Sequence, residues 1–196
     1  MENNEKYIPF LPLFEKLDEM LKNGSVVLAI DGGSASGKTT LSGILNEIYG
    51  CTVLHTDDFF LRPEQRTPER YAEVGGNLDR ERFLEEVLRP LKRNETINYR
   101  RFDCATFTIS PFTEIKPEKL TVIEGAYSMH PTLAEYYDLA VFLDISPELQ
   151  RERILKRNSA EEAERFFSKW IPLEREYFSK MHVGQRCDMI IKIENE

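Results

Sequence analysis

The chain has 196 residues, of which 41% are hydrophobic and 31% are charged, a composition typical of one folded globular domain and unlike that of a disordered or membrane-embedded chain. Its 34 acidic residues outnumber 26 Lys and Arg and give a net charge of −8, which disfavours nucleic acid or an acidic membrane as partner, because such binding depends on charge neutralisation. Three widely spaced cysteines without a CxxC pair, Cys51, Cys104 and Cys187, disfavour a disulfide framework and a zinc site.

The first ten residues, MENNEKYIPF, carry acids where a signal peptide needs bases. Later apolar runs are too short to span a membrane. Together with the odd number of cysteines, these features predict a cytoplasmic protein without membrane contact. A net negative surface is compatible with a monomer and with a homo-oligomer.

The predicted elements alternate between strands and helices. The first is an amphipathic helix over 10–22, which ends at Asn23-Gly24. Short apolar runs typical of parallel strands buried on both faces follow at 26–30, 52–54, 120–123, 139–143 and 189–193. Helical stretches are expected at 39–48, 80–91, 131–137 and from 147 to about 181. This order predicts an α/β fold, a doubly wound sheet of five parallel strands with right-handed crossovers.

The region 60–116 differs from the rest in composition. It is rich in proline and in scattered aromatic residues, and it contains the pair Gly75-Gly76. We expect it to be an insertion over the edge of the sheet where α/β proteins bind ligands. The whole chain, 1–196, is then a single domain.

A phosphate-binding loop is the strongest motif. Residues 32–39 read G-G-S-A-S-G-K-T and match G-x-x-x-x-G-K-[ST], between a buried strand and an amphipathic helix. Small residues let successive N–H groups point at phosphate oxygens, while Lys38 reaches the β- and γ-phosphates and Thr39 binds Mg²⁺. The predicted nucleotide-binding residues are Gly32, Gly33, Ser34, Ala35, Ser36, Gly37, Lys38, Thr39 and Thr40.

Acidic residues follow two other predicted strands. Asp57 and Asp58 come after the second strand, where a carboxylate can accept a proton from an attacking hydroxyl; a helix cap or turn is an equally good interpretation. Glu124 ends the strand at 120–123 and precedes Gly125 and the aromatic Tyr127, an arrangement that favours Mg²⁺ binding over a solubilising acid.

Arg153 and Arg157 lie four residues apart on one face of a predicted helix. Such a face could close over a triphosphate and neutralise charge. Taken alone, a solvated helix with i,i+4 pairs is the simpler interpretation.

Taken together, these segments resemble the uridine kinase and phosphoribulokinase-like P-loop kinases, a family that includes nicotinamide riboside kinases. The resemblance extends over about 26–193. Besides the phosphate loop and Arg153 with Arg157, it rests on D-x-F-[FY] at 57–60, Asn77-Leu78-Asp79, Phe102-Asp103, Glu124-Gly125 and the closing Cys187-Asp188-Met-Ile-Ile.

The resemblance implies a kinase that uses ATP or GTP with Mg²⁺ held by Thr39 and Glu124. Asp57 would be the base or orienting group for a primary hydroxyl, most simply the ribose 5′-hydroxyl of a nucleoside, with Asp58 as the next candidate. Arg153 and Arg157 would belong to a lid over the phosphates, at about 147–160. The small-molecule acceptor would contact Asp57, Phe60, Asp79, Phe102, Asp103 and Tyr127.

Several positions depart from the family pattern. Phe107 replaces the histidine that reads the pyrimidine in uridine–cytidine kinases, Phe102 lacks a hydroxyl, and Gln150 stands where the lid has its first arginine. The insertion also carries three arginines, Arg62, Arg66 and Arg70. Nicotinamide riboside, another sugar or a phosphorylated sugar therefore remain alternative acceptors.

Other function classes fit less well. A GTP-driven switch reads guanine through N-K-x-D, which this sequence lacks. A transporter or motor ATPase would need further signature segments, and none is visible in this sequence. A non-catalytic nucleotide sensor or a simple NTPase remains the alternative of another class, although a sensor need not retain Lys38, Thr39, Asp57 and Glu124.

Overall fold

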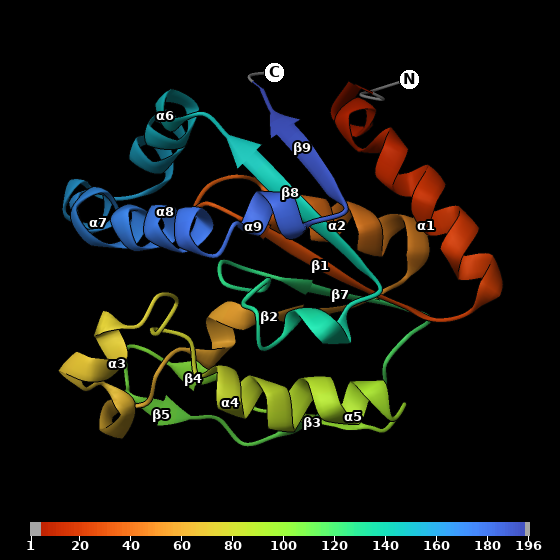
Figure 1. The fold of residues 1–196 in the computed structure, drawn as a ribbon, viewed down its shortest axis with the longest axis horizontal. Helices are drawn as coiled ribbons and strands as arrows, with labels where there is room; N and C mark the ends of the chain where they lie inside the picture. Colours follow the sequence, from red (N-terminus) through yellow and green to blue (C-terminus); the bar gives the residue numbers. More distant parts are fainter. Residues whose placement is uncertain (1–4, 195–196) are drawn as a thin grey trace.

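The centre of the protein is a sheet of five parallel strands. The computed structural model describes residues 5–194, so the first four residues of the acidic N-terminal segment and the last two residues lie outside it. The strands are β1 (Val26–Gly32), β2 (Thr52–His55), β7 (Leu120–Glu124), β8 (Leu139–Ile145) and β9 (Met189–Ile193). They pair in the order β2-β7-β1-β8-β9 (Figure 1). The predicted α/β fold is thereby confirmed.

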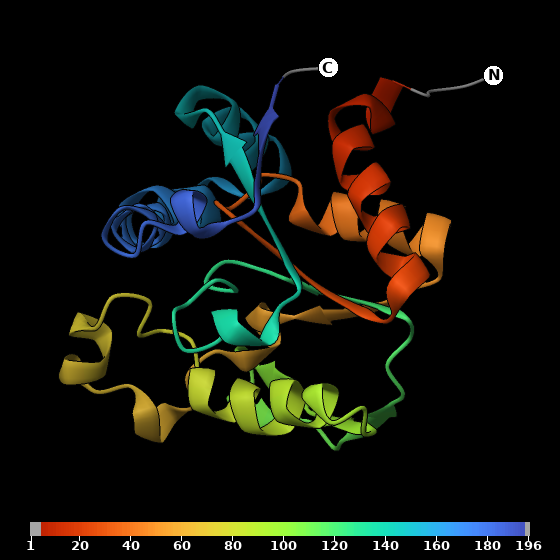
Figure 2. The same cartoon turned by 45° about the vertical axis from the view of Figure 1, so that its right-hand side comes forward.

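One face of the sheet packs against α1 (Leu11–Asn23) and α2 (Lys38–Tyr49), which lie together on one side of it in Figure 2. Side chains along β1 alternate between the two faces, as the period of two requires. Leu28 and Ile30 join this core, in which Leu13, Leu17 and Leu41 are fully buried. Ala29 joins the core on the opposite face.

The opposite face is covered by a helical segment of the insertion and by two helices near the C-terminus. The insertion segment runs through α4 (Arg80–Phe83), a π-helical turn (Leu84–Leu88) and α5 (Arg89–Lys92). The C-terminal pair is α8 (Ile171–Lys180) and α9 (Val183–Arg186). Phe83 and Tyr177 are fully buried in this second core, so burial of apolar surface fixes both helical groups against the sheet.

The rest of the insertion is built from short elements, drawn in yellow and green in Figure 1. After the 3-10 turn Thr56–Phe59, which precedes the insertion, a second 3-10 turn, Pro63–Gln65, leads into α3 (Pro68–Ala72). Strand β3 (Ile97–Tyr99) then pairs antiparallel with β6 (Thr113–Ile115). Strand β4 (Phe102–Asp103) pairs antiparallel with β5 (Thr108–Ile109).

The predicted helical region from 147 to 181 is divided into shorter helices. These are α6 (Pro147–Arg157), α7 (Ala160–Arg165), a π-helical turn (Phe166–Trp170) and α8. The break between α6 and α7 is set by Ser159, whose hydroxyl accepts a hydrogen bond from the Glu162 amide while the Glu162 carboxylate accepts from the Ser159 amide. This capping box starts a new helix and ends the old one.

The helix predicted over 131–137 is wrong. In this segment the structure has only a 3-10 turn, Ala134–Tyr136, after a run of turns. Elsewhere, a separate 3-10 turn at Glu5–Phe10 precedes α1. Positive φ angles at Gly125 (+143°) and Tyr127 (+73°) turn the chain sharply after β7. Backbone hydrogen bonds further along join mostly residues three apart, such as Leu133 to His130 and Tyr136 to Leu133, so the chain forms 3-10 turns in place of an α-helix.

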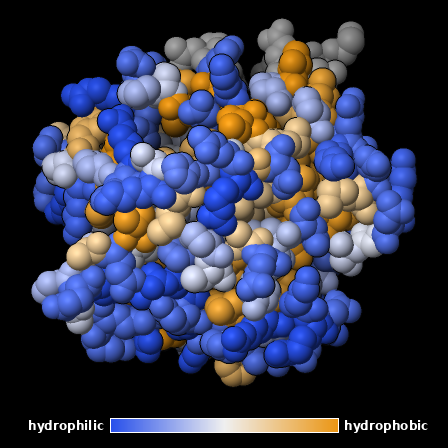
Figure 3. All heavy atoms as spheres, in the orientation of Figure 1, coloured by the Kyte–Doolittle hydropathy of each residue, from blue (hydrophilic) through white to orange (hydrophobic). Residues whose placement is uncertain are grey.

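The surface is mostly polar. In Figure 3 the lower part of the visible face, over α4 and α5, is predominantly hydrophilic, and hydrophobic side chains gather in smaller groups. Between residues 5 and 194, no helix combines the length and apolarity that crossing a bilayer requires.

Candidate active site

The loop between β1 and α2 has the form of a phosphate cradle. The Lys38 ammonium donates to the carbonyl oxygens of Gly32 at 2.8 Å and Gly33 at 3.0 Å, so the side chain folds back over the loop. Gly37 precedes the helix with φ +97°, a conformation that glycine adopts without strain. The positive end of α2 begins at Lys38 and faces the loop, so the arrangement favours an anion.

Parallel pairing brings the acids of two strands to the same edge as the loop. His55 at the end of β2 lies opposite Glu124 at the end of β7 in the register. The Thr39 hydroxyl donates to Glu124 Oε1 at 3.0 Å, and His55 Nδ1 lies 2.7 Å from the same oxygen. The predicted pair Thr39 and Glu124 is therefore in contact.

His55 and Glu124 shift each other's pKa. Burial pushes the pKa of Glu124 up, but the hydrogen bond and charge of His55, the charge of Lys38 and the hydrogen bond from Thr39 together leave the pKa below its ordinary value. The hydrogen bond to Glu124 in turn raises the pKa of His55. Glu124 is thus held as a carboxylate next to the phosphate loop.

Gly125 allows β2 and β7 to end close together. A Cβ atom on this residue would lie 2.1 Å from the Thr56 hydroxyl and 3.2 Å from Asp57 Oδ1. The Thr56 hydroxyl also donates to the Ala126 carbonyl at 3.1 Å. Only glycine fits after Glu124 without a steric clash. The close approach that Gly125 permits places Asp57 beside Glu124.

Asp57 and Asp58 have different surroundings. Desolvation by the surrounding protein raises the pKa of Asp57 to about 6, although the nearby Lys38 ammonium opposes the shift. Asp58 accepts a hydrogen bond from the Tyr99 hydroxyl at 2.8 Å and pairs with Arg101 at 3.2 Å. Between residues 5 and 194, the Asp57 carboxylate accepts no hydrogen bond, so its oxygens face the site without a protein partner, whereas those of Asp58 are engaged.

Asp31 was not among the predicted site residues. Its side chain connects the start of the phosphate loop to two other segments, at Met129 and Tyr177. Its buried carboxylate accepts from the amides of Gly32 (2.7 Å) and Met129 (2.9 Å) and from the Tyr177 hydroxyl (2.8 Å). Burial raises its pKa to about 6. Its position as the last side chain of a buried strand before the loop is the signal that could have identified it.

A cavity of about 1830 Å³ joins these groups. It lies between the strand ends, the insertion and the helices α6 to α8, and it is large enough for a nucleotide and a second small molecule. The predicted residues that line it are Ser34, Ala35, Ser36, Gly37, Lys38, Thr39, Thr40, Asp57, Phe60, Glu124, Tyr127, Arg153 and Arg157.

The structure places three predicted acceptor residues outside the cavity lining. Asp79 is fully buried, caps α4 through the Arg82 amide and accepts from Arg62 Nε at 3.1 Å. Asp103 is exposed and accepts from the Ala105 amide at 2.8 Å within the β4–β5 turn. Phe102 packs in the insertion. In this arrangement all three support the insertion, and their acceptor contacts stay predictions.

Two side chains of α6 donate hydrogen bonds to the phosphate loop. Arg153 donates to the Ala35 carbonyl at 3.3 Å, and Gln150 donates to the Ser34 carbonyl at 2.9 Å. Arg157 donates to the Asn158 side chain at 2.9 Å, and its guanidinium lies over the Phe166 ring. Gln150, at the position that departs from the family pattern, therefore binds the loop backbone.

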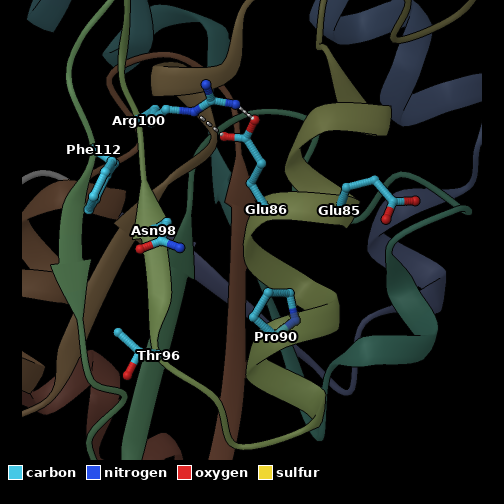
Figure 4. A pocket seen from close by; sticks show the side chains of 7 residues that line it. All are labelled: Glu85, Glu86, Pro90, Thr96, Asn98, Arg100 and Phe112. Atoms are coloured by element: carbon cyan, nitrogen blue, oxygen red, sulfur yellow. Dashed lines mark hydrogen bonds and ion pairs between the residues drawn. The ribbon is translucent and has the colours of Figure 1, made fainter.

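A second, smaller hollow of about 390 Å³ lies between the α4–α5 segment and β3. Figure 4 shows Glu86 and Arg100 paired with each other across it, while Glu85 points away from the pair. Its lining includes neither the phosphate loop nor a strand end of the main sheet. The large cavity is therefore the candidate active site.

Comparisons with known sequences identify a family. The model of the phosphoribulokinase/uridine kinase family matches residues 27–166. The chain is 30% identical to a uridine kinase of Chlamydia pneumoniae over 148 residues, which are 70% of this chain and 64% of that one. It is 26% identical to a phosphoribulokinase of Synechocystis sp. over 141 residues, 69% of this chain and 42% of that one. The chain thus spans less than two thirds of each of these relatives.

Solved structures share the fold. A provisionally assigned fructose transport system kinase of Silicibacter sp. TM1040 superposes with a TM-score of 0.70 at 23% identity, covering 91% of this chain and 94% of that one. A provisionally assigned uridine kinase of Bacillus stearothermophilus superposes with a TM-score of 0.65 at 22% identity, covering 92% of this chain and all of that one, 100%.

Proposed function

The chain belongs to the phosphoribulokinase/uridine kinase family, and from that membership we propose that it is an ATP- and Mg²⁺-dependent small-molecule kinase. It transfers the γ-phosphoryl group to a primary hydroxyl, with the 5′-hydroxyl of a nucleoside as the leading acceptor. One observation carries the proposal: Lys38, Thr39, Asp57 and Glu124 converge from the loop and two strand ends on one cavity.

The residues around the loop divide the work of the reaction. Lys38 and the loop amides bind the phosphates, and Arg153 and Arg157 approach them from the lid. Asp57 accepts the proton of the acceptor hydroxyl. At the same time the hydroxyl oxygen forms a bond to the γ-phosphorus, and the bond from that phosphorus to ADP breaks. The protein contributes mainly position and charge, because phosphoryl transfer needs little covalent help.

The donor set near the loop fits Mg²⁺. Thr39 Oγ1 and Glu124 Oε1 are oxygens 3.0 Å apart, and Mg²⁺ is usually held by one or two protein oxygens with phosphate oxygens and waters. When bound there, the ion would neutralise phosphate charge. His55 holds Glu124 in place through the same carboxylate oxygen.

Replacing Glu124 with glutamine is expected to raise the Mg²⁺ concentration for half-maximal activity by about tenfold. The amide keeps the shape of the side chain but loses the charge that attracts the cation. The measurement is the initial rate as a function of free Mg²⁺ at saturating ATP. An unchanged Mg²⁺ requirement would place the metal ligand elsewhere, and Glu118→Gln, at a residue outside the cavity lining, is the control.

The test of the function is ADP release from Mg²⁺-ATP with a panel of acceptors: nucleosides, nicotinamide riboside, free sugars and phosphorylated sugars. Release that depends on one class of acceptor supports the kinase and identifies its substrate. Release without acceptor dependence would indicate a simple NTPase. Bound ATP without release would favour a nucleotide sensor.

Arg66 favours a second candidate, a kinase for a phosphorylated sugar. Arg62 pairs with Asp79 at 3.1 Å and Arg70 with Glu81 at 2.8 Å. Within 5–194, Arg66 instead shows no ion pair: its Nε donates to the Leu61 carbonyl at 2.9 Å, and its guanidinium lines the cavity 4.7 Å from the Phe107 ring centre. A guanidinium in this position can bind phosphate through two N–H groups.

If the acceptor is phosphorylated, Arg66→Ala is expected to raise its KM by about ten- to a hundredfold, because a charge-assisted pair of hydrogen bonds is lost. The KM for ATP should change little. Steady-state kinetics with both substrates varied provide the measurement. An unchanged acceptor KM would contradict this candidate and leave the neutral nucleoside as acceptor.

A further inference from the structure

A carboxylate from α8 is bound by the phosphate loop itself. Glu174 accepts hydrogen bonds from the Ser34 amide at 2.9 Å and from the Ser34 hydroxyl at 2.5 Å. The two residues are 140 positions apart in the chain, and Glu174 is only 5% exposed at the wall of the large cavity. Neither the motif nor the helical spacing of the sequence predicted this contact.

The contact is one of several hydrogen bonds between the helices and the phosphate loop. Three side chains from α6 and α8 reach consecutive loop residues: Gln150 donates to the Ser34 carbonyl at 2.9 Å, Arg153 to the Ala35 carbonyl at 3.3 Å, and Glu174 accepts from Ser34. Helices α6 and α8 are thereby connected directly to the phosphate loop.

The chemistry of the contact resembles that of the expected ligand. A backbone N–H and a hydroxyl of an anion-binding loop hold an anionic oxygen pair, as they would hold phosphate oxygens. Lys38, which reaches toward the β- and γ-phosphates in such loops, ends on the Gly33 carbonyl at 3.0 Å, one residue from Ser34. A Cβ atom on Gly33 would lie 3.7 Å from Glu174 Oε2.

The charge of the Glu174 carboxylate also affects Asp57, the residue expected to contact the acceptor. Its negative charge is one of the influences that raise the pKa of Asp57, together with that of Glu124. Glu174 and Asp57 both line the large cavity, and Glu174 is held at the loop itself. In a kinase the γ-phosphate lies between the phosphate loop and the acceptor base.

We propose that Glu174 takes the place of the γ-phosphate at the Ser34 end of the loop in the nucleotide-free protein, and that ATP displaces it. This inference rests on the proposed function, because it requires a nucleoside triphosphate. Displacement of Glu174 loosens the hold of α8 on the loop only when a γ-phosphate is present. ADP leaves the contact in place.

The test is the affinity of the whole protein for two nucleotides, with Mg²⁺ and without acceptor, by isothermal titration calorimetry. One is ADP and the other is the non-hydrolysable ATP analogue AMPPNP. Glu174→Gln keeps a hydrogen-bonding side chain but removes the competing charge, so we expect the Kd for AMPPNP to fall by about tenfold and the Kd for ADP to change less than twofold. Glu176→Gln, an exposed neighbour on α8, is the matched control and should change neither.

Ser34→Ala provides a second variant, because it removes the hydroxyl donor and keeps the backbone. It should shift the ratio of the two Kd values in the same direction by a smaller factor, and thermal unfolding would confirm that both variants fold. An equal change in both Kd values, or no change in either, would overturn the inference and show that Glu174 only supports the loop. Failure of the wild-type protein to bind either nucleotide would overturn the proposed function itself.

Discussion

Alanine in place of Lys38 is expected to abolish phosphoryl transfer, with a loss in kcat/KM of at least about a thousandfold. The ammonium is buried against the loop and donates to two of its carbonyls. When nucleotide binds, it is the positive group that reaches the β- and γ-phosphates, and no other side chain of the loop carries positive charge.

The measurement is the initial rate with ATP and the acceptor found in the panel, together with ATP binding by calorimetry. Lys16→Ala, on the exposed face of α1, removes the same charge far from the loop and should leave the rate unchanged. Near-normal activity of the Lys38 variant would refute the assignment of the loop.

Asparagine in place of Asp57 is expected to lower kcat by about a thousandfold and to leave the Kd for ATP within about twofold. Asparagine has nearly the same shape but cannot accept the proton of the acceptor hydroxyl. The phosphate-binding contacts of Lys38 and the loop do not involve this side chain, so nucleotide binding should persist.

The control is Asp58→Asn. Asp58 already accepts a hydrogen bond from Tyr99 and pairs with Arg101, so its loss should reduce stability more than kcat. Single-turnover rates for both variants separate chemistry from product release. A large loss of kcat in the Asp58 variant, with little change in the Asp57 variant, would reverse the assignment of the base.

The sheet and the loop could be predicted because their signals are local. Short apolar runs such as 26–30 and 139–143 require strands buried on both faces, and Gly32–Thr39 match a motif whose spacing follows from phosphate binding. Glu124 and Asp57 could be proposed because the carboxyl ends of parallel strands meet at one edge of a sheet.

The contacts that organise the site across the chain could not be predicted. Glu174 and Ser34 meet only because α8 folds back over the loop, and the sequence pattern predicted only a helical stretch there. Asp79 followed the family pattern in sequence, but in the structure it caps a helix and binds Arg62. The segment 131–137 forms 3-10 turns in place of the expected helix, because its backbone hydrogen bonds join mostly residues three apart, which the residue spacing did not indicate.

The central claim is that Asp57 and the phosphate loop act together to phosphorylate a small-molecule hydroxyl. The most direct test is to incubate the protein with Mg²⁺-ATP and the acceptor selected by the panel, and to examine the products by phosphorus-31 NMR, with the Asp57→Asn protein as the blank. The account predicts a phosphate monoester on a primary hydroxyl in equal amount to ADP, formed by the wild-type protein only. Inorganic phosphate as the sole product, or equal ester formation by both proteins, would contradict it.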